Sequence, residues 1–392
     1  MSNPVEGHMA IFLQFLWLGC TSFGGPVAHL GIFRRVFVEQ KQVFSESDYA
    51  NLVALCQVIP GPASSQVGMG IGYRLGGTAG AFAAFVGFTL PSALLMAFGG
   101  WAVLSGNLPE TSWLVTALKL VALGIVTQAV IGMWGQLCQS RETKLAALIA
   151  AVLFYIQPTA WAQVGMIAVA LLAGHVLLKS DDADAPAPAP TLSTQTGIAS
   201  LALYALLLIA AVTLPWSDAL SQILTGNYLS GALVFGGGHV VLPLLESEFV
   251  PPLSEDVFLA GYGLAQAMPG PLFTLGSYLG AVTLAEQPLL GALVATLAIF
   301  LPGALLLAGT AAVGGQMLPW LKPRLMYVNA VVVGLLLSVL VNPIFTESVY
   351  NAATTGLACV SLALTVGLKR SPLELVSVMV ILTFITHWFV GL

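Results

Sequence analysis

The sequence predicts an all-α polytopic membrane protein: two inverted repeats of about six spans each, joined by a linking helix, with helices broken at Gly/Pro motifs. Hydrophobic residues make up 58% of the 392 residues, charged residues make up 7%, and the mean hydropathy is +0.93. A soluble domain of this length does not have such a composition. Two further observations define the architecture: a Pro-Gly-Pro motif that occurs twice inside apolar runs, and a match between the two halves.

Long apolar runs predict about thirteen spans. In the first half we expect spans at 10–33, 48–74, 76–104, 112–137, 144–157 and 160–179, and in the second half at 219–244, 256–285, 288–314, 324–341, 349–368 and 372–391. Between the halves lie an acidic and Ala-Pro-rich linker, 180–196, and an apolar linking helix, 197–214. We therefore divide the chain into an N-terminal repeat (1–179), a connecting region (180–218) and a C-terminal repeat (219–392).

Each Pro-Gly-Pro motif must interrupt its helix. Proline lacks an N–H group, clashes with the preceding turn and forces the residue before it out of the α region. A lipid bilayer tolerates such a break only where protein covers it or where it lines a cavity. The helix that begins after Pro60-Gly61-Pro62, or after Pro269-Gly270-Pro271, directs N–H groups and partial positive charge into the break. This arrangement is typical of an anion site.

The two halves match over a sustained register. Phe23-Gly24-Gly25 matches Phe235-Gly236-Gly237 at an offset of 212 residues, and Gln57 with its Pro-Gly-Pro motif matches Gln266 with the second motif at an offset of 209. A match with such small slips indicates an internal duplication. Paired broken helices in inverted repeats are typical of secondary transporters.

Basic residues test the orientation. With thirteen spans and a cytoplasmic N-terminus, eight basic residues fall inside, only Arg34, Arg35 and Lys41 fall outside, and Lys119 lies within a span. A rival topology makes each Pro-Gly-Pro segment a re-entrant hairpin, places seven basic residues inside and four outside, and leaves the halves parallel. We expect the inverted arrangement, with a periplasmic C-terminus.

Together, the Phe-Gly-Gly and Gln-x-x-Pro-Gly-Pro motifs in both halves resemble those of the chromate ion transporter family in its long, two-domain form. The resemblance covers nearly the whole chain. It implies chromate efflux across a bacterial inner membrane, chromate resistance, sulfate as a look-alike anion, and thirteen spans in an antiparallel layout. The sequence departs from its own repeat at Gly238-His239, where the first copy has Pro26-Val27, so equal roles of the two halves stay open. Composition and spacing alone indicate only a secondary transporter for an anion.

The substrate site is expected at the four helix starts that follow Gly25, Gly61, Gly237 and Gly270. Each helix start carries about +0.5 charge, so four present up to roughly +2, which matches a dianion. The alternative is that these residues only permit close helix packing. The candidate substrate-binding residues are Gly24, Gly25, Gln57, Gly61, Ser64, Ser65, Lys119, Gly236, Gly237, Gln266, Gly270, Thr274 and Asn329.

Lys119 is the one cation that the sequence places inside a span, and no acid lies near it in the sequence. Its repeat mate, which is the residue at the equivalent position of the other half, is Asn329. Charges inside a membrane are costly and are commonly functional. The alternative is that its long side chain reaches the nearer interface. The candidate groups for proton coupling are Glu39, Glu248, His29 and His239, which could instead be surface carboxylates and packing histidines.

Other kinds of site and partner find little support. The four cysteines show no CxxC or CxxH spacing, so we expect buried free thiols, no metal and no cofactor. A scattered net charge of −5 does not suggest nucleic acid, so the expected partners are an oxyanion and the lipid bilayer; a homodimer is left open. An oxyanion uptake permease and a passive anion channel remain alternatives. A membrane-embedded enzyme is a distant one, because GxSG, HExxH and Walker motifs are absent.

Overall fold

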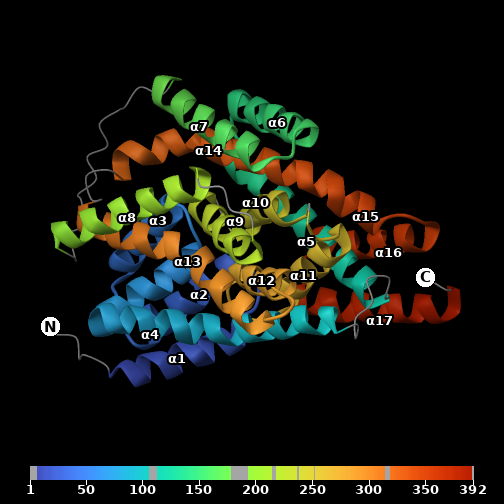
Figure 1. Ribbon diagram of the computed structural model, residues 1–392, viewed down its shortest axis with the longest axis horizontal. Coiled ribbons are helices and arrows are strands. Elements are labelled where there is room, and N and C mark those ends of the chain that lie inside the picture. Colours follow the sequence, from blue (N-terminus) through green and yellow to red (C-terminus); the bar gives the residue numbers. More distant parts are fainter. Residues whose placement is uncertain are drawn as a thin grey trace.

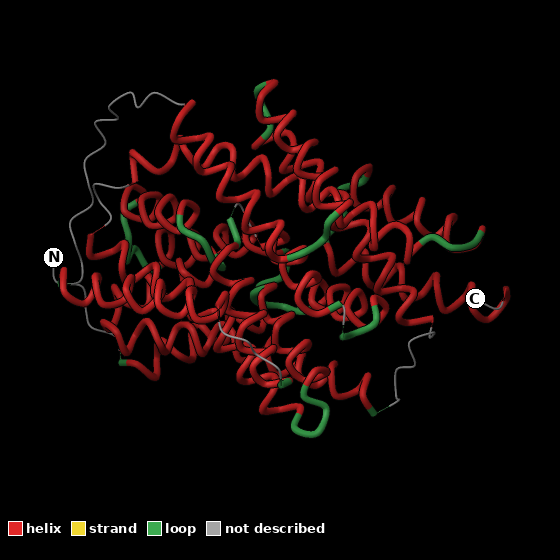
Figure 2. The backbone as a smooth tube through the Cα atoms, turned by 45° about the horizontal axis from the view of Figure 1, so that its top comes forward, coloured by secondary structure: helices red, strands yellow, loops and turns green. Residues whose placement is uncertain are grey.

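The computed structural model describes residues 7–105, 113–177, 193–213, 218–235, 238–250, 252–313 and 318–390, which form helices joined by short loops and contain no strand (Figures 1 and 2). The first half contains α1 (His8–Thr21), α2 (Gly25–Arg34), the π-helical turn η1 (Arg35–Gln40), α3 (Glu46–Val58), α4 (Ala63–Leu104), α5 (Trp113–Leu137), α6 (Arg141–Ile156) and α7 (Ala160–Leu177). The second half contains α9 (Ala219–Leu233), η2 (Gly238–Val240), α10 (Val241–Phe249), α11 (Glu255–Ala267), η3 (Leu272–Thr274), α12 (Leu275–Thr283), α13 (Pro288–Val313), α14 (Leu318–Val339), η5 (Leu340–Phe345), α15 (Thr346–Ser348), α16 (Ala352–Leu362), η6 (Ala363–Gly367) and α17 (Pro372–Val390). The all-helical expectation is confirmed for the described residues.

Equivalent helices in the two halves begin in the same way. Ser45 caps α3 and Ser254 caps α11, each accepting a backbone N–H from three residues further on. Reciprocal capping boxes start α6 at Ser140 and α16 at Asn351. The sequence match between the halves therefore reflects the same local structure in each.

Helices α1 and α2 form a hairpin. The rings of Phe15 and Phe37 stack with centroids 5.4 Å apart, and the Lys41 ammonium donates to the Gln14 side chain at 2.7 Å. In one straight helix Phe15 and Phe37 would be about 33 Å apart, at 1.5 Å per residue. The expected single span at 10–33 is thus corrected: the chain turns back at its Phe-Gly-Gly break.

Helices α3 and α4 form a second hairpin. A Cβ atom at Gly70 would come within 2.7 Å of the Leu52 side chain, so these two positions are in direct contact. Along a straight helix they would be about 27 Å apart. The expected span at 48–74 therefore also turns back, at the Pro-Gly-Pro break. This is the re-entrant arrangement of the rival topology.

The chain folds once more within α4. Gly76 and Gly77 have non-helical backbone angles, and a Cβ at Gly72 would meet Ala84 at 2.6 Å. The element is thus two helices packed side by side, the second of which, 78–104, lies along α1.

The second half repeats both hairpins. In the first, the Gln222 side-chain amide on α9 donates to the Glu248 carbonyl on α10 at 3.2 Å. In the second, the Tyr278 hydroxyl on α12 donates to the Val257 carbonyl on α11 at 2.9 Å. The spans expected at 219–244 and 256–285 are therefore hairpins as well.

Among the described residues, six helices are long and apolar enough to cross a membrane: α4, α5, α8 (Thr194–Thr213), α13, α14 with the turns after it, and α17. Several shorter apolar helices accompany them. Because four expected spans are hairpins, the structure does not support a count of thirteen crossings.

The linking helix α8 begins three residues earlier than expected, and the linker up to residue 192 lies outside the described residues. Helix α8 packs on α13 and α9. Its Tyr204 hydroxyl donates to the Ala232 carbonyl at 3.1 Å, and the Tyr228 hydroxyl donates to the Tyr204 carbonyl at 3.0 Å. The linking helix is therefore anchored to the second half.

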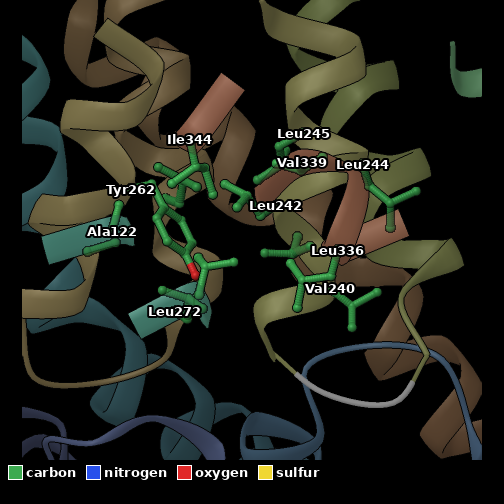
Figure 3. Packing of buried hydrophobic residues seen from close by; sticks show 14 of the residues in the cluster. Ala122, Val240, Leu242, Leu244, Leu245, Tyr262, Leu272, Leu336, Val339 and Ile344 are labelled. Atoms are coloured by element: carbon green, nitrogen blue, oxygen red, sulfur yellow. The ribbon is translucent and has the colours of Figure 1, made fainter. Parts of the chain in front are cut away.

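The largest apolar core joins the halves. Figure 3 shows Ala122 of α5 beside Tyr262 of α11, with Leu336 of α14 and Val240 opposite. Helix α5 packs against α11, α16 and α17, and α14 packs against α6 and α7. Each half therefore supplies helices that cover the other.

The outer surface is apolar, as a lipid-facing surface must be. Large exposed hydrophobic side chains include Trp17, Phe98, Trp161, Leu293 and Trp388. Of the free cysteines, Cys56 and Cys138 are buried as expected, whereas Cys20 and Cys359 are exposed on this surface, which corrects that expectation.

Candidate functional site at the hairpin tips

The hairpin tips of the two halves meet at the centre of the molecule. The Gly61 N–H donates to the Val234 carbonyl at 2.9 Å, and the Gly270 N–H donates to the Ser22 carbonyl at 2.8 Å. Ser22 and Val234 directly precede the two Phe-Gly-Gly motifs. Each Pro-Gly-Pro tip is thus bonded to the Phe-Gly-Gly tip of the other half. We call residues 22–25, 59–62, 234–235 and 268–271 the central tip cluster.

The tip contacts obey an internal pseudo-two-fold relation. The two hydrogen bonds are equivalent under the duplication, because their donors are repeat mates and so are their acceptors. Pro26 and Gly238 are also repeat mates, and a Cβ atom at Gly238 would come within 2.8 Å of the Pro26 ring. Two equivalent residues of the two halves can contact each other only if both lie close to the axis that relates the halves. This axis therefore passes through the central tip cluster.

Glycine is required at both Pro-Gly-Pro tips by the backbone and by the neighbours. Gly61 has φ 122° and Gly270 has φ 97°, which other residues rarely adopt. A Cβ at Gly61 would meet the Gly303 Cα at 2.9 Å, and a Cβ at Gly270 would meet the Ser92 hydroxyl at 2.8 Å. Close packing, the alternative that the sequence left open, is thus visible at both positions.

The first Phe-Gly-Gly tip is less crowded. Gly24 (φ 100°) and Gly25 (φ 74°) also have left-handed backbones. Gly24 is exposed, and a Cβ added at Gly25 would meet no atom within 4 Å. Open space therefore lies in front of the first turn of α2, where backbone N–H groups are free of helical partners.

Several buried polar atoms around the cluster have no hydrogen-bond partner among the described residues. They are Ser22 Oγ, His29 Nδ1, Ser65 Oγ, Gln66 Oε1 and Gln266 Nε2. A buried polar atom without a partner costs about 1–3 kcal/mol, and such atoms are rare in folded proteins. These groups come from both halves and are available to a bound ligand or to water.

Gln66 braces the first Pro-Gly-Pro tip, because its side-chain amide donates to the Pro60 carbonyl at 2.9 Å and to the Gly303 carbonyl at 3.1 Å. We expect Gln66→Met, which keeps the volume but removes both bonds, to lower the free energy of unfolding by about 1–3 kcal/mol. Thermal unfolding in detergent measures this loss. Gln57→Met is the matched control, since Gln57 is exposed, and an equal loss in both variants would contradict the bracing role.

Three candidate residues have hydrogen-bond partners of their own. The Thr274 hydroxyl donates to the Pro271 carbonyl at 2.8 Å. His29 Nε2 lies 3.2 Å from the Ser22 carbonyl, and His239 Nδ1 lies 3.0 Å from the Tyr262 hydroxyl. Both histidines therefore contact the hairpin helices in the packing role that was the alternative to proton coupling.

The two candidate glutamates lie at the hairpin ends away from the tips. Glu39 is exposed and forms an ion pair with Arg34, which also pairs with Glu46. The hydrogen bond from Arg34 to Glu46 and the charge of Glu46 hold the pKa of Arg34 above its usual value. Glu248 is half-buried, and its backbone carbonyl accepts the bond from Gln222. Neither carboxylate belongs to the central tip cluster.

The remaining candidates are distributed unevenly. Ser64 is buried in the first turn of α4, Gln57 is exposed in the last turn of α3, and Asn329 is half-buried on α14. Gly236 and Gly237 lie outside the described residues.

Lys119 is not an unpaired cation. Its ammonium lies 2.5 Å from Asp256 and 3.8 Å from Glu347, both in the second half of the chain. Asp256 is in the first turn of α11, whereas the tip follows the last turn, so about 15–20 Å of helix separates Lys119 from Gly270. The expectation of a lysine without a nearby acid, close to the helix starts, is thus corrected.

The positive potential of the cluster comes from helix starts, and the halves differ. In the first half, α2 and α4 begin as α-helices at the tips. In the second half, the 3-10 turns η2 and η3 come before α10 and α12. The α-helical starts aim a larger dipole at the centre. The cluster can therefore hold a small anion with N–H and side-chain donors, more strongly from the first half.

Sequence reasoning missed three residues beside the site, Ser92, Gly303 and Tyr262, and it missed Asp256, which pairs with Lys119 away from the tips. Ser92 and Gly303 are repeat mates that directly follow the matching pairs Leu90-Pro91 and Leu301-Pro302, a signal that could have identified them. Asp256 replaces the serine of the first copy, just as Lys119 stands opposite an asparagine. Lys119 and Asp256 have opposite charges, and each stands where the other half has an uncharged residue. This pattern could have predicted that the two residues form an ion pair.

Paired glycine-rich hairpin tips at the centre of an apolar helical bundle define a membrane transporter. A family model described as chromate transporter matches residues 9–178 and 221–388. The chain belongs to the chromate transporter family, and this membership supports a function in chromate transport.

Curated relatives agree with the family. The chain is 30% identical over 314 residues to a chromate transport protein of Cupriavidus metallidurans, covering 76% of this chain and 73% of the relative. It is 27% identical over 318 residues to a chromate transport protein of Pseudomonas aeruginosa, covering 76% and 71%. It is 26% identical over 314 residues to an uncharacterized transporter of Methanocaldococcus jannaschii, covering 78% and 76%. No solved structure matches the chain.

Proposed function

We propose that the protein exports chromate from the cytoplasm across a bacterial inner membrane and thereby confers chromate resistance. The observation that carries this proposal is the central tip cluster, which combines helix starts, unpartnered buried polar atoms and open space before α2. A cluster of N–H and side-chain donors at helix starts suits a tetrahedral oxyanion, whose oxygens accept hydrogen bonds. Relatives that carry the name chromate transport protein support the choice of anion.

Export needs no ATP. Moving one charge through 100 mV is worth about 2.3 kcal/mol, so a dianion that leaves a negative interior gains about 4.6 kcal/mol. This gain supports a concentration ratio of roughly three decades. The membrane potential is therefore a sufficient driving force, and an exchanged proton would add to it.

The hairpins suggest nine crossings. Each half then begins with two hairpins that return to their own side, followed by four crossing helices. In the first half these are the second part of α4 (78–104), α5, α6 and α7; in the second half they are α13, α14, α16 with η6, and α17. The linking helix α8 is the ninth. Because each half has an even number of crossings, α8 inverts the second half, as expected before.

The positive-inside rule supports this arrangement more strongly than it supports thirteen spans. With a cytoplasmic N-terminus, eleven of the twelve basic residues fall on the inner side and none on the outer side. They are Arg34, Arg35, Lys41, Arg74, Arg141, Lys144, Lys179, Lys322, Arg324, Lys369 and Arg370. The twelfth, Lys119, lies near the outer end of α5.

Reporter fusions test the topology. We expect fusions after Lys144 and after Leu392 to report opposite sides of the membrane, with the first cytoplasmic. A fusion after Gln42, between the two hairpins, should also report the cytoplasm, whereas thirteen spans place it outside. A periplasmic signal after Gln42 would rule out nine crossings.

Flux into inverted membrane vesicles tests the function, with the potential and the pH gradient set separately. We expect saturable uptake of labelled chromate that rises with an inside-positive potential and is inhibited by sulfate. Non-saturable flux would indicate a passive channel. Saturable flux only in right-side-out vesicles would indicate an uptake permease.

A further inference from the structure

The two hairpins of each half meet at their bases through one pair of equivalent side chains. In the first half, Arg34 forms an ion pair with Glu46 of α3, and Arg34 Nε donates to the Glu46 carboxylate at 3.0 Å. The offset of 212 residues found at the Phe-Gly-Gly motifs relates Arg34 to Glu246. The offset of 209 residues found at the Pro-Gly-Pro motifs relates Glu46 to Glu255. In the second half, an acid therefore takes the place of the arginine and is expected to face another acid.

The structure confirms that the two acids face each other. Glu255 of α11 is the charged group that acts on Glu246 of α10. Both residues are half-buried, and Glu246 Oε2 is buried without a hydrogen-bond partner among the described residues. Two ionised carboxylates that face each other away from water repel, and a buried oxygen without a donor is costly. A proton on one of the two carboxyls removes the repulsion.

No lysine or arginine is placed to neutralise Glu246. Helix α10 packs against α7, α9, α11, α14 and η2 (Figure 1). The described side chains of these helices include no lysine or arginine, and Lys322 and Arg324 come in the first turns of α14, on the inner side. Only Glu255 acts on Glu246 by its charge; the other titratable side chains described on α10 and these helices are Glu248, Asp256, Tyr228, Tyr262, Tyr327, His175 and His239. A proton is therefore the positive charge that can neutralise Glu246.

Helix α7 places a buried amide against the same turn of α10. Gln163 is 0% exposed, and its Nε2 donates to the Pro243 carbonyl at 2.8 Å and to the Ser247 hydroxyl at 3.3 Å. These two residues stand three positions before and one position after Glu246, so the amide lies beside it. Within the part of the chain that the structure describes, Gln163 Oε1 has no partner. Such unpartnered acceptors suit a carboxyl that carries a proton, because only the protonated form is a donor.

A third carboxyl connects this pair with the outer surface. Glu255 is hydrogen-bonded to Glu347, which requires a proton on one of the two groups. The Glu347 side chain is 39% exposed and lies 3.8 Å from the Lys119 ammonium. In the nine-crossing arrangement these residues are on the outer side. Glu347, Glu255 and Glu246, which we call the carboxyl chain, thus run from an exposed group to a buried one.

We propose that Glu246 and Glu255 form a proton-binding site, which takes a proton from the outer side through Glu347 and exchanges it for chromate. This inference rests on the proposed transport function and on the nine-crossing arrangement. Glu246 is about 12 Å along the chain from Gly238, which touches the tip of the other half, so the proton and the anion act on the same short hairpin arm. Loss of the proton leaves two facing carboxylates, whose repulsion pushes α10 away from α11. Carboxyl series of this kind are typical of proton relays in transporters.

Infrared difference spectroscopy tests the proton without any substrate. Protonated carboxyl groups have a C=O stretching band that ionised carboxylates lack. In the purified full-length protein at neutral pH, we expect Glu246→Gln to lower this absorbance by the equivalent of about one carboxyl group. Glu46→Gln is the matched control, because Glu46 is exposed and is paired with Arg34, and it should leave the absorbance as it is. Unchanged absorbance in Glu246→Gln would overturn the site.

A pH gradient at zero membrane potential tests the exchange. In inverted vesicles the lumen is the outer side, so a lumen more acidic by one pH unit should accumulate chromate about tenfold for each exchanged proton. Glu246→Gln should give a concentration ratio near one, and so should Glu246→Arg, which recreates the ion pair of the first half. Glu46→Gln should keep the tenfold ratio.

A membrane potential separates this site from the transport function. An inside-positive potential should still drive chromate into vesicles that contain Glu246→Gln, which shows that the variant is folded. A tenfold pH-driven ratio that persists in Glu246→Gln would overturn the exchange. Failure of chromate export is a different result, because it abolishes uptake under the potential in the unaltered protein and leaves the infrared band in place.

Discussion

Replacing Gly61 or Gly270 by leucine should lower transport by about tenfold or more. Both glycines have left-handed backbones, and a side chain would collide with Gly303 or Ser92 across the halves. Left-handed strain costs about 1–2 kcal/mol and overpacking about 1–3 kcal/mol. Since 1.4 kcal/mol is a factor of ten, a penalty on the transporting conformation lowers transport by about tenfold or more. Chromate flux per inserted molecule in inverted vesicles measures the loss.

Gly77→Leu is the matched control for these variants. Gly77 has φ 64°, so leucine is strained there too, but a Cβ at Gly77 meets no atom within 4 Å and the residue lies far from the tips along α4. We expect this variant to keep most of its transport. Equal flux in all three variants and in the unaltered protein would show that the tip glycines do not matter for transport.

Lys119 forms ion pairs with Asp256 and Glu347, and Asp256→Ala should be the most destabilising single change among these three residues. It leaves Lys119, whose side chain is 7% exposed, without its nearest counter-charge. Breaking a buried pair costs about 3–5 kcal/mol, and we expect the lower part of this range because Glu347 remains at 3.8 Å. Thermal and denaturant unfolding in detergent measure the loss of stability.

The reverse change should cost less. Lys119→Ala leaves Asp256, whose side chain is 28% exposed and can still be hydrated. Lys119→Ala/Asp256→Ala should recover part of the stability that Asp256→Ala loses, because no lone buried charge remains. A double variant less stable than Asp256→Ala would contradict this account of the pair.

Local features of the fold were readable from the sequence. Apolar composition predicts helices, and proline with glycine predicts where they break, because both effects act over a few residues. The match between Phe23-Gly24-Gly25 and Phe235-Gly236-Gly237 pointed to the centre, because Ser22 and Val234, which directly precede the two motifs, accept the hydrogen bonds of the Pro-Gly-Pro tips. These inferences depend on local chemistry or on repetition.

The path of the chain through each break was not readable. A straight span and a hairpin use the same apolar residues, and only distant contacts such as Phe15 with Phe37 distinguish them. The partner of Lys119 was equally hidden, since Asp256 is 137 residues away in the sequence. The proposed nine crossings place eleven basic residues on the inner side and thirteen spans place eight there, so the charge count was the sequence feature that could have favoured the hairpins.

The crossed hydrogen bonds at the centre have a consequence for chains of half this length. Gly61 is bonded by Val234 and Gly270 by Ser22, so neither half completes its own tip. A polypeptide with one half alone would need a second copy to build the same centre. Under the proposed inversion, that copy would have to insert into the membrane upside down. Under the same proposal, helix α8 makes such dual insertion unnecessary, because it would deliver the second half in the opposite orientation within one chain.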